Sequence, residues 1–581
     1  MPAVATLDAL ALTFAPRAIA GIYATHFMAL SLLSFPLTAV LALAWQLGRR
    51  WRAPLRLMAA TLFFLIFFYA VRTVAIAWGA RYGATVPLLW WLTATVPLSL
   101  FLARYASTLL DNLIGFSWFL ALVGAVCVPF AFIDVDATPP AAPVAAPAVR
   151  PDILLVTIDT LAARQMSLYG ASQSTTPNID RLAQRGLMFD RAYAGANFTT
   201  AGINTLLTGR YPDEHRSLQL GGRALPRYRA TSLPALLQRA GYRSTYVSTN
   251  SYAAPWRNGY ARYFDNGVGD ATRWRVYVCE DELVRWLPYV CQVNHPAINL
   301  ITPLLIHNDT NNLEYDGRLV TRAAQSLMAS IHGDQRPLFL WVHLFPPHDP
   351  YAAPSGCLGH FYPGPQHRTA ATSQPIYGLR PAGASLRTTR LLEQRYRESL
   401  WCADRTVGQI VEQMRRRDRP FVLIITADHG ESFTPVLTGH GGPWLNEDAI
   451  RIPLLVALPG MTRPRRSATI ASQTDVLPIV RAILDGADAD RLAALVAARR
   501  RAEPALSMEF IDNRRLAPLT RGGVAAIGER GKYIRYLSPP GPFRALADQS
   551  SPGAASDTRE GRQLRATVAA RLARYGNKVN P

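Results

Sequence analysis

Two apolar runs in this sequence each end in side chains that could bind a divalent metal ion. Residues 152–159 read DILLVTID and end in Asp159, while residues 420–426 read PFVLIIT and lead into Asp428 and His429. Such runs are typical of parallel strands buried on both faces, and α/β sheets bind ligands at the carboxyl ends of these strands. Two carboxylates and an imidazole suit a hard or borderline divalent cation. The pattern predicts a metal site, although a single aspartate at a strand end is more often a helix cap or an ion-pair partner.

Helices must alternate with these strands to position the three side chains. Thr176, Pro177 and Asn178 open an amphipathic segment, NIDRLAQRG, that ends at Gly186. Proline in the first turn and glycine after the last turn are the usual signals of helix boundaries. Strands that alternate with helices over several hundred residues favour a doubly wound α/β domain.

Apolar residues are concentrated at the N-terminus. Of the 581 residues, 49% are hydrophobic and only 17% are charged, below the roughly 25% that is usual in soluble proteins. Crossing a bilayer takes about 20 apolar residues, and four N-terminal stretches are long enough: residues 19–47, 57–79, 85–103 and 113–132. A buried core helix is the alternative for any single stretch, but four in succession favour a transmembrane domain of about four helices over residues 1–136.

Loop charges predict the orientation of these spans. The first loop carries four arginines, at positions 49, 50, 52 and 56, and the third begins with Arg104, whereas Asp134 and Asp136 follow the fourth span. Arginine-rich loops stay in the cytoplasm, so both chain ends should lie outside. The Pro/Ala-rich composition of residues 137–150 indicates a semi-rigid linker. We therefore expect a multi-pass protein of a bacterial-type inner membrane whose catalytic domain lies in the periplasm.

The chain is strongly basic, with 61 basic and 40 acidic residues and a net charge of +21. Almost all of the positive charge is arginine, since Lys532 and Lys578 are the only lysines. Nucleic acid and anionic membrane surfaces are the usual partners of such a chain. No basic helix, zinc finger or RNA-binding motif accompanies the arginines, so nucleic acid is not expected as a partner.

Four of the five cysteines lie beyond the predicted spans, and the fifth, Cys127, lies within the last span. An oxidising compartment would allow these four to form two disulfides. Proximity in the sequence favours Cys279–Cys291 and Cys357–Cys402, although three pairings are possible and free buried thiols are the alternative.

Several motifs together resemble the sulfatase-type members of the alkaline phosphatase superfamily. They are TPNIDRLAQRGLMFDRAYA at 176–194, LLTGRYP at 206–212, FPPHDPY at 345–351, TADHGES at 426–432 and GHGGPWLNEDAIRIPLLV at 439–456. The resemblance runs from about residue 151 to the end. It implies a catalytic domain over residues 151–485 with a large mixed sheet between helices, and a C-terminal subdomain over residues 486–581. That subdomain would hold a small antiparallel sheet, and GERGKYIRYL at 528–537 resembles one of its strands.

The resemblance also implies a nucleophile. Sulfatases oxidise a cysteine or serine to formylglycine in a Cys-x-Pro-x-Arg context, a fixed distance before the LLTGR segment. The same distance leads here to Thr199, and the residues after it supply neither the proline nor the arginine, so formylglycine cannot form. Threonine at this position resembles phosphoethanolamine transferases and lipoteichoic acid synthases and implies a covalent phospho-threonine. Thr200 stays open as an alternative, as does a structural role in which both hydroxyls cap the following helix.

Direct coordination would give a threonine hydroxyl the activation that it needs as a nucleophile. The expected metal ligands are therefore Asp159, Thr199, Asp428 and His429. Thr160 follows Asp159 where many members of the family have a second aspartate, which disfavours calcium and leaves zinc, manganese or magnesium. No further Asp/His ligand set is evident, so a single divalent ion is expected.

Histidines or arginines should replace the lysines that hold the sulfate oxygens in true sulfatases, since neither lysine stands at the family positions. His348 in the PHDP turn and His440 in the GHGG loop match positions that contact the transferred group or the leaving oxygen. Either could protonate a departing alkoxide or activate an incoming hydroxyl. His343, in the apolar run LFLWVHLF, is expected to be a core residue, and His215 is ambiguous.

Three functions are compatible with these features. The first is a membrane-bound transferase that moves a phosphoethanolamine- or phosphoglycerol-type head group from a phospholipid donor, through Thr199, to an envelope glycan or lipid acceptor. The second is a sulfuric or phosphoric ester hydrolase in which water is the acceptor. The third is an inactive scaffold, which the retention of Thr199 together with Asp159, Asp428 and His429 disfavours.

Overall fold

The computed structural model describes only part of the chain, and all of that part belongs to one compact unit, Pro139–Thr272 with Pro296–Pro581. The four expected membrane spans, Cys127, Cys279 and Cys291 lie outside the described residues. None of the described helices is both long and apolar enough to span a membrane. The described residues are 150–250, 252–268, 317–331, 333–349, 351, 356–362, 386–434, 438–442, 444–511, 513, 519–537 and 558–574.

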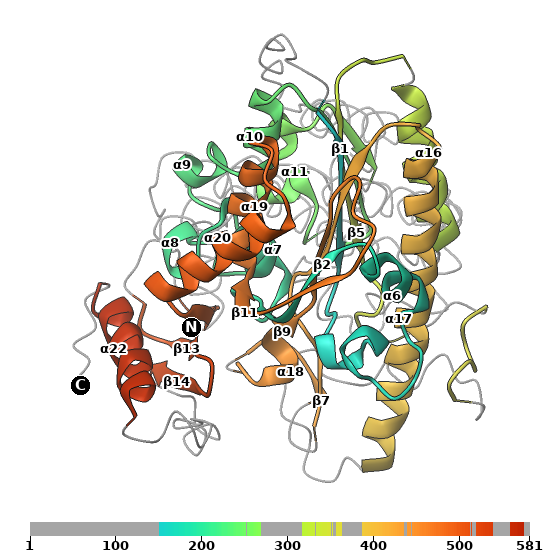
Figure 1. The fold of residues 1–581 in the computed structure, drawn as a ribbon. Helices are drawn as coiled ribbons and strands as arrows, with labels where there is room; N and C mark the ends of the chain where they lie inside the picture. Colours follow the sequence, from blue (N-terminus) through green and yellow to red (C-terminus); the bar gives the residue numbers. More distant parts are fainter. Residues whose placement is uncertain are drawn as a thin grey trace, which may run out of the picture. The chain divides into compact units, whose positions relative to one another are not determined.

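A nine-stranded mixed sheet forms the centre of this unit (Figure 1). Its order is β11-β2-β10-β6-β1-β5-β3-β4, with β9 paired to β2, and β10 runs antiparallel to both of its neighbours. The expected doubly wound α/β architecture is confirmed. The strands are β1 (Asp152–Ile158), β2 (Leu187–Tyr193), β3 (Arg243–Ser248), β4 (Asn266–Val268), β5 (Leu338–Leu344), β6 (Phe421–Ala427), β9 (Arg451–Ile452), β10 (Leu454–Ala457) and β11 (Arg465–Ser472).

The two apolar runs predicted as strands are β1 and β6, which are parallel neighbours at the centre of the sheet. Their last residues pair in register, Ile158 with Ala427. Every residue of β1 is buried, as is every residue of β6 except the first. Burying one large aliphatic side chain contributes roughly 1.5–3 kcal/mol relative to leaving it exposed. The apolar faces of these strands therefore hold their two carboxyl ends together at one edge of the sheet.

Helices cover both faces of the sheet. One layer contains α6 (Pro177–Ala183), α16 (Gly317–Ser330) and α17 (Leu386–Arg415), and the other contains α7 (Thr199–Thr208), α10 (Leu233–Arg239), α19 (Val476–Leu484) and α20 (Ala489–Ala502) (Figure 1). The predicted helix after Thr176 is α6. Its first free N–H groups are satisfied by Asp404 of α17, which accepts from the backbone of Asn178 at 2.9 Å and of Ile179 at 2.8 Å.

A separate three-stranded antiparallel sheet follows, made of β12 (Ala505–Glu509), β13 (Gly522–Ile527) and β14 (Lys532–Leu537). The expected strand within residues 528–537 is β14. Helix α22 (Arg559–Ala573) packs on this sheet through Leu564, Val568 and Leu572. Arg571 of this helix binds Asp213 in α8 (Pro212–His215) with a nitrogen–oxygen distance of 2.6 Å, which ties the small sheet to the helix that follows α7.

Cys357 and Cys402 form a disulfide with a Cα–Cα distance of 6.0 Å, as their proximity in the sequence predicts. Buried Glu398, one turn earlier on α17, accepts hydrogen bonds from the backbone of Gly359, Phe361 and Tyr362. These contacts fasten residues 356–362 to α17.

Helix α7 begins directly against the loop that follows β6. Gly202, in its first turn, allows this approach, because a Cβ at that position would lie 2.3 Å from the carbonyl oxygen of Asp428. Gln473 clamps the same carbonyl, donating to it at 2.7 Å while its own carbonyl oxygen accepts from the N–H of Gly195 at 2.9 Å. The start of α7 and the end of β6 are thus held as one piece.

Replacing Gly202 with alanine should therefore destabilise the fold. The added methyl group meets a clamped backbone carbonyl rather than a flexible side chain, and overpacking of this kind costs about 1–3 kcal/mol. The free energy of unfolding of Gly202→Ala measures this cost. Gly356→Ala is the control, because a Cβ there would meet nothing within 4 Å. Equal stability of the two variants would contradict the close approach of α7.

Candidate active site

Asp159, Asp428 and His429 meet where β1 and β6 end. All three side chains have no solvent exposure, and their ligand atoms lie within 4.8 Å of one another. Asp159 comes from the loop after β1, and the other two come from the loop after β6. The structure therefore brings together the three side chains that the two apolar runs place at this edge of the sheet.

The atoms that face one another in this cluster have no hydrogen-bond partner. They are Oδ1 of Asp159, Oδ2 of Asp428 and Nε2 of His429, and all three are buried. The nitrogen lies 3.8 Å from the first oxygen and 3.6 Å from the second. His429 Nδ1 lies 2.9 Å from the carbonyl of Gly430, which can only accept, so the proton sits on Nδ1 and the lone pair on Nε2. Buried atoms left unpaired in this way fit a cation held between them.

Electrostatics favour a cation at the same point. Burial raises the pKa of Asp159, but the positive charge of His348 and a hydrogen bond from His343 hold it below its usual range. Burial and the negative charge of Asp159 raise the pKa of Asp428 well above its usual range. Burial, together with the charge of His440, lowers the pKa of His429 well below its usual range, so its imidazole is neutral. A divalent cation would remove the repulsion between the two carboxylates.

Thr199 is the first residue of α7, three residues before the Gly202 that touches Asp428, and it is 3% exposed. The hydroxyl of Thr200 is already used, because it accepts from the N–H of Gly221 at 2.9 Å. Phe198 precedes the helix, and no side-chain hydrogen bond caps it. Thr199 thus lies at the N-terminus of a helix, which favours an anion, and in the same turn as the Gly202 that approaches Asp428.

The loop that carries His440 is tied to the chain just before α7. Asn197 donates to the carbonyls of Gly442 at 2.9 Å and Trp444 at 2.6 Å, and its own carbonyl accepts from Gly441. The ring of His440 lies 4.5 Å, between centroids, from the ring of His429. The loop that carries His440 therefore lies beside both the chain before α7 and the candidate ligand His429.

His348, Asp349 and His440 form a second cluster of ligand atoms within 4.8 Å of one another. This corrects the expectation that no further Asp/His set exists. Burial lowers the pKa of His348, but the charges of Asp349 and Asp159 raise it well above its usual value. His440 Nδ1 lies 3.1 Å from the carboxylate of buried Glu431, which orients its ring. The sequence motif shows His348 but not that Asp349 turns toward His440.

Residues 151–486 match the family model described as Sulfatase. The chain belongs to the sulfatase family. It is 24% identical over 360 residues to the uncharacterised sulfatase YidJ of Escherichia coli, a match that covers 58% of this chain and 68% of that protein. It is 23% identical over 426 residues to the choline-sulfatase of Rhizobium meliloti, covering 66% and 78%. The solved structure of Ps i-CgsB with k-i-k-neocarrahexaose shares the fold, with a TM-score of 0.50, 17% identity and coverage of 73% of this chain and 92% of that one.

This sulfatase-family chain is therefore an enzyme of the alkaline phosphatase superfamily, whose members depend on a metal ion. At the position after Asp159, Thr160 has a left-handed backbone, with φ of 56°. Its N–H donates to Oδ1 of Asp428 at 3.1 Å. Thr160 thus orients the carboxylate of the candidate ligand Asp428 through its backbone.

Two residues beside Asp159 carry no signal in the sequence. Asn250, just beyond β3, donates to Oδ2 of Asp159 at 2.5 Å. His343 is buried, as expected of a core residue, but its Nε2 also lies 3.3 Å from the same oxygen. His215, the ambiguous histidine, accepts from the backbone of Ser217 at 3.0 Å and lies 3.1 Å from the hydroxyl of Thr205, so its role is structural.

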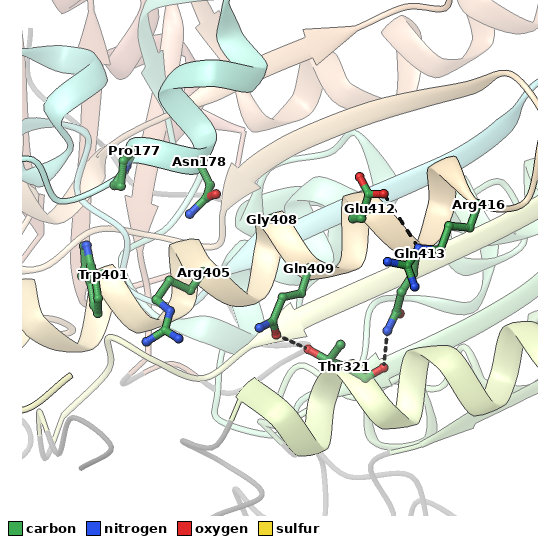
Figure 2. Close-up of a pocket in the computed structure, with 10 residues that line it drawn as sticks. All are labelled: Pro177, Asn178, Thr321, Trp401, Arg405, Gly408, Gln409, Glu412, Gln413 and Arg416. Carbon is green, nitrogen blue, oxygen red and sulfur yellow. Dashed lines mark hydrogen bonds and ion pairs between the residues drawn. The ribbon is translucent and has the colours of Figure 1, made fainter. Parts of the chain in front are cut away.

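A cavity of about 580 Å³ lies away from this site, between α6, α16 and α17 (Figure 2). Its side chains include Trp401, Arg405, Glu412 and Arg416. A neighbouring cavity reaches Phe421, the first residue of β6, whereas the metal ligands follow the last residue of that strand. Neither cavity contains the carboxylate–histidine chemistry of the sheet edge.

A divalent cation should raise the thermal stability of the chain through Asp159, Asp428 and His429. At about 100 times its dissociation constant, a ligand that binds only the folded state stabilises it by about 2.7 kcal/mol. Zinc, manganese and magnesium can each be added to metal-stripped protein while the unfolding midpoint is followed. Asp428→Asn should lose the response, whereas Glu412→Gln, an exposed carboxylate in the cavity of Figure 2, should keep it. An unchanged response in Asp428→Asn would refute this site.

Proposed function

We propose that this enzyme transfers a phospho-head group of the phosphoethanolamine or phosphoglycerol type through a covalent intermediate on Thr199. The observation that carries this proposal is a threonine at the start of α7, beside three buried ligand atoms that have no partner. Threonine keeps its hydroxyl and cannot become the formylglycine of true sulfatases. A phosphate ester on Thr199 would lie at the N-terminus of a ten-residue helix, where backbone N–H groups favour its negative charge.

Asp159, Asp428 and His429 would hold the metal, with Thr199 as a fourth ligand. When bound, a divalent cation supplies a lower pKa for the threonine hydroxyl and neutralises charge on the transferred group. Oγ1 of Thr199 then forms a bond to phosphorus, and the bond from phosphorus to the donor's alkoxy oxygen breaks. The departing oxygen takes a proton, and in the second half-reaction the acceptor hydroxyl loses one as it displaces Thr199.

In this proposal His348 and His440 carry these protons. Their rings lie 4.8 Å apart between centroids, and the ring of His440 lies 4.5 Å from that of the metal ligand His429. The charges around His348 favour its protonated form, which suits the donor of a proton to the leaving oxygen. Glu431 fixes His440 through Nδ1, which suits a group that works through its other nitrogen.

The donor in this proposal is a phospholipid, and the acceptor is an envelope glycan or lipid. The four apolar stretches predicted within residues 1–136 support a lipid donor, because a membrane anchor keeps the catalytic domain beside its substrate. The Cys357–Cys402 disulfide supports a periplasmic catalytic domain, because disulfides persist in oxidising compartments.

A sulfuric or phosphoric ester hydrolase is the second candidate. The names of the relatives favour it, since the matched proteins of Escherichia coli and Rhizobium meliloti are both sulfatases. Both candidates share attack by Thr199 and differ in whether water or an envelope hydroxyl removes the group. Release of free head group without a modified acceptor distinguishes the hydrolase. An inactive scaffold is disfavoured by the retained ligand cluster.

Incubation of the full chain with vesicles of phosphatidylethanolamine or phosphatidylglycerol should add the head group to Thr199. Intact-mass and peptide-mass measurements detect the adduct. Thr199→Ala should form none and should lose turnover by at least about 1,000-fold, as expected on removal of a nucleophile. Thr200→Ala should still form the adduct, because its hydroxyl bonds to Gly221 instead. An adduct on Thr200, or cleavage of 4-nitrophenyl sulfate that persists in Thr199→Ala, would contradict the proposal.

A further inference from the structure

A continuous buried chain of polar side chains lies beneath Asp159. Thr157 on β1 pairs in register with His343 on the neighbouring β5. The hydroxyl of Thr157 lies 2.8 Å from Nδ1 of His343 and 2.9 Å from Nε1 of Trp341. Nε2 of His343 lies 3.3 Å from Oδ2 of Asp159. None of these four side chains is more than 1% exposed.

The side chains at the two ends of this hydrogen-bonded row, Trp341 and Asp159, determine where its protons lie. The indole of Trp341 can only donate, so the oxygen of Thr157 accepts from it. An ionised carboxylate can only accept, so Nε2 of His343 carries a proton and donates it to Asp159. Since the oxygen of Thr157 accepts from Trp341, its hydroxyl proton is left to be donated, and Nδ1 of His343 lies within reach at 2.8 Å. Donation therefore runs in one direction, from Trp341 through Thr157 and His343 to Asp159.

These hydrogen bonds give the two carboxylate oxygens of Asp159 different roles. Oδ2 receives two donors, His343 at 3.3 Å and Asn250 at 2.5 Å. Oδ1 receives none, is buried, and lies 3.8 Å from Nε2 of His429. Rotating the carboxylate would break both hydrogen bonds, so the carboxylate presents Oδ1 alone to the other two ligand atoms.

We propose that His343, held in one tautomer by Thr157 and Trp341, is a positioning residue that sets the affinity of the metal site through Asp159. The inference rests on the metal site of the proposed function. Residues that orient a metal ligand from behind typically change affinity by about 10–100-fold when they are removed. His343 is neither a metal ligand nor a catalytic residue, because it reaches the site only through Asp159.

The dissociation constants for Zn²⁺ and Mn²⁺, measured on metal-stripped full chain against a chromophoric chelator, test this inference. His343→Leu removes the donor to Asp159 and should weaken binding by about 10–100-fold. His343→Gln can again place an amide N–H near Oδ2 and should recover most of the affinity. Thr157→Val leaves the volume unchanged but releases the tautomer, so it should weaken binding in the same direction by a smaller factor.

His215→Gln is the matched control. This histidine is also buried, and both of its ring nitrogens face other residues: Nε2 lies 3.1 Å from the hydroxyl of Thr205, and Nδ1 accepts from the N–H of Ser217 at 3.0 Å. Its substitution should lower the unfolding midpoint of the metal-free chain without changing the metal dissociation constant. An equal loss of affinity in His215→Gln and His343→Leu would overturn the inference, because affinity would then follow general destabilisation.

The measured dissociation constants distinguish an absent metal site from a metal site that does not depend on His343. Asp159→Asn should abolish binding in an otherwise intact chain. If the wild-type chain binds neither ion, the metal site itself is refuted. If it binds and Asp159→Asn does not, but His343→Leu retains the wild-type dissociation constant, only the role of His343 is refuted.

Discussion

The fold must keep three candidate ligand atoms buried without hydrogen-bond partners, and the rest of the site depends on this. Oδ1 of Asp159, Oδ2 of Asp428 and Nε2 of His429 face one another at the end of β1 and β6. A buried polar atom without a partner costs about 1–3 kcal/mol, and a charged one costs more. The surrounding sheet must hold these atoms in place against that cost. The buried apolar strands β1 and β6, which end at the cluster, supply the stability that makes such an arrangement possible.

Backbone contacts hold the start of α7, which carries the proposed nucleophile Thr199, against the loop after β6. Gly202 lets the first turn of α7 contact Asp428, and Gln473 joins the end of β6 to the segment before α7. Asn197 joins that segment to the loop that carries His440. Each contact uses a backbone carbonyl or N–H group, so the placement of Thr199 depends on chain geometry more than on its own side-chain contacts.

The sequence predicts those parts of the site that follow from local patterns. Apolar runs identify β1 and β6, and the residues directly after them are the metal-ligand candidates. Asn250 and His343 are not predictable in this way, because their contact with Asp159 depends on β5 lying next to β1, and on β3 lying on the other side of β5. The apolar neighbours of His343 favour a core position, which is correct for its burial but does not reveal its bond to Asp159. Asp349 is hidden for a similar reason, since only the turn after β5 brings it near His440.

The metal site at the ends of β1 and β6 can be tested by locating a bound ion. Crystals of the catalytic domain soaked in zinc, with diffraction collected on both sides of the zinc absorption edge, would give an anomalous difference peak at the ion. We expect a peak among Asp159, Thr199, Asp428 and His429. A peak confined to His348, Asp349 and His440, with none at the end of β1 and β6, would contradict it.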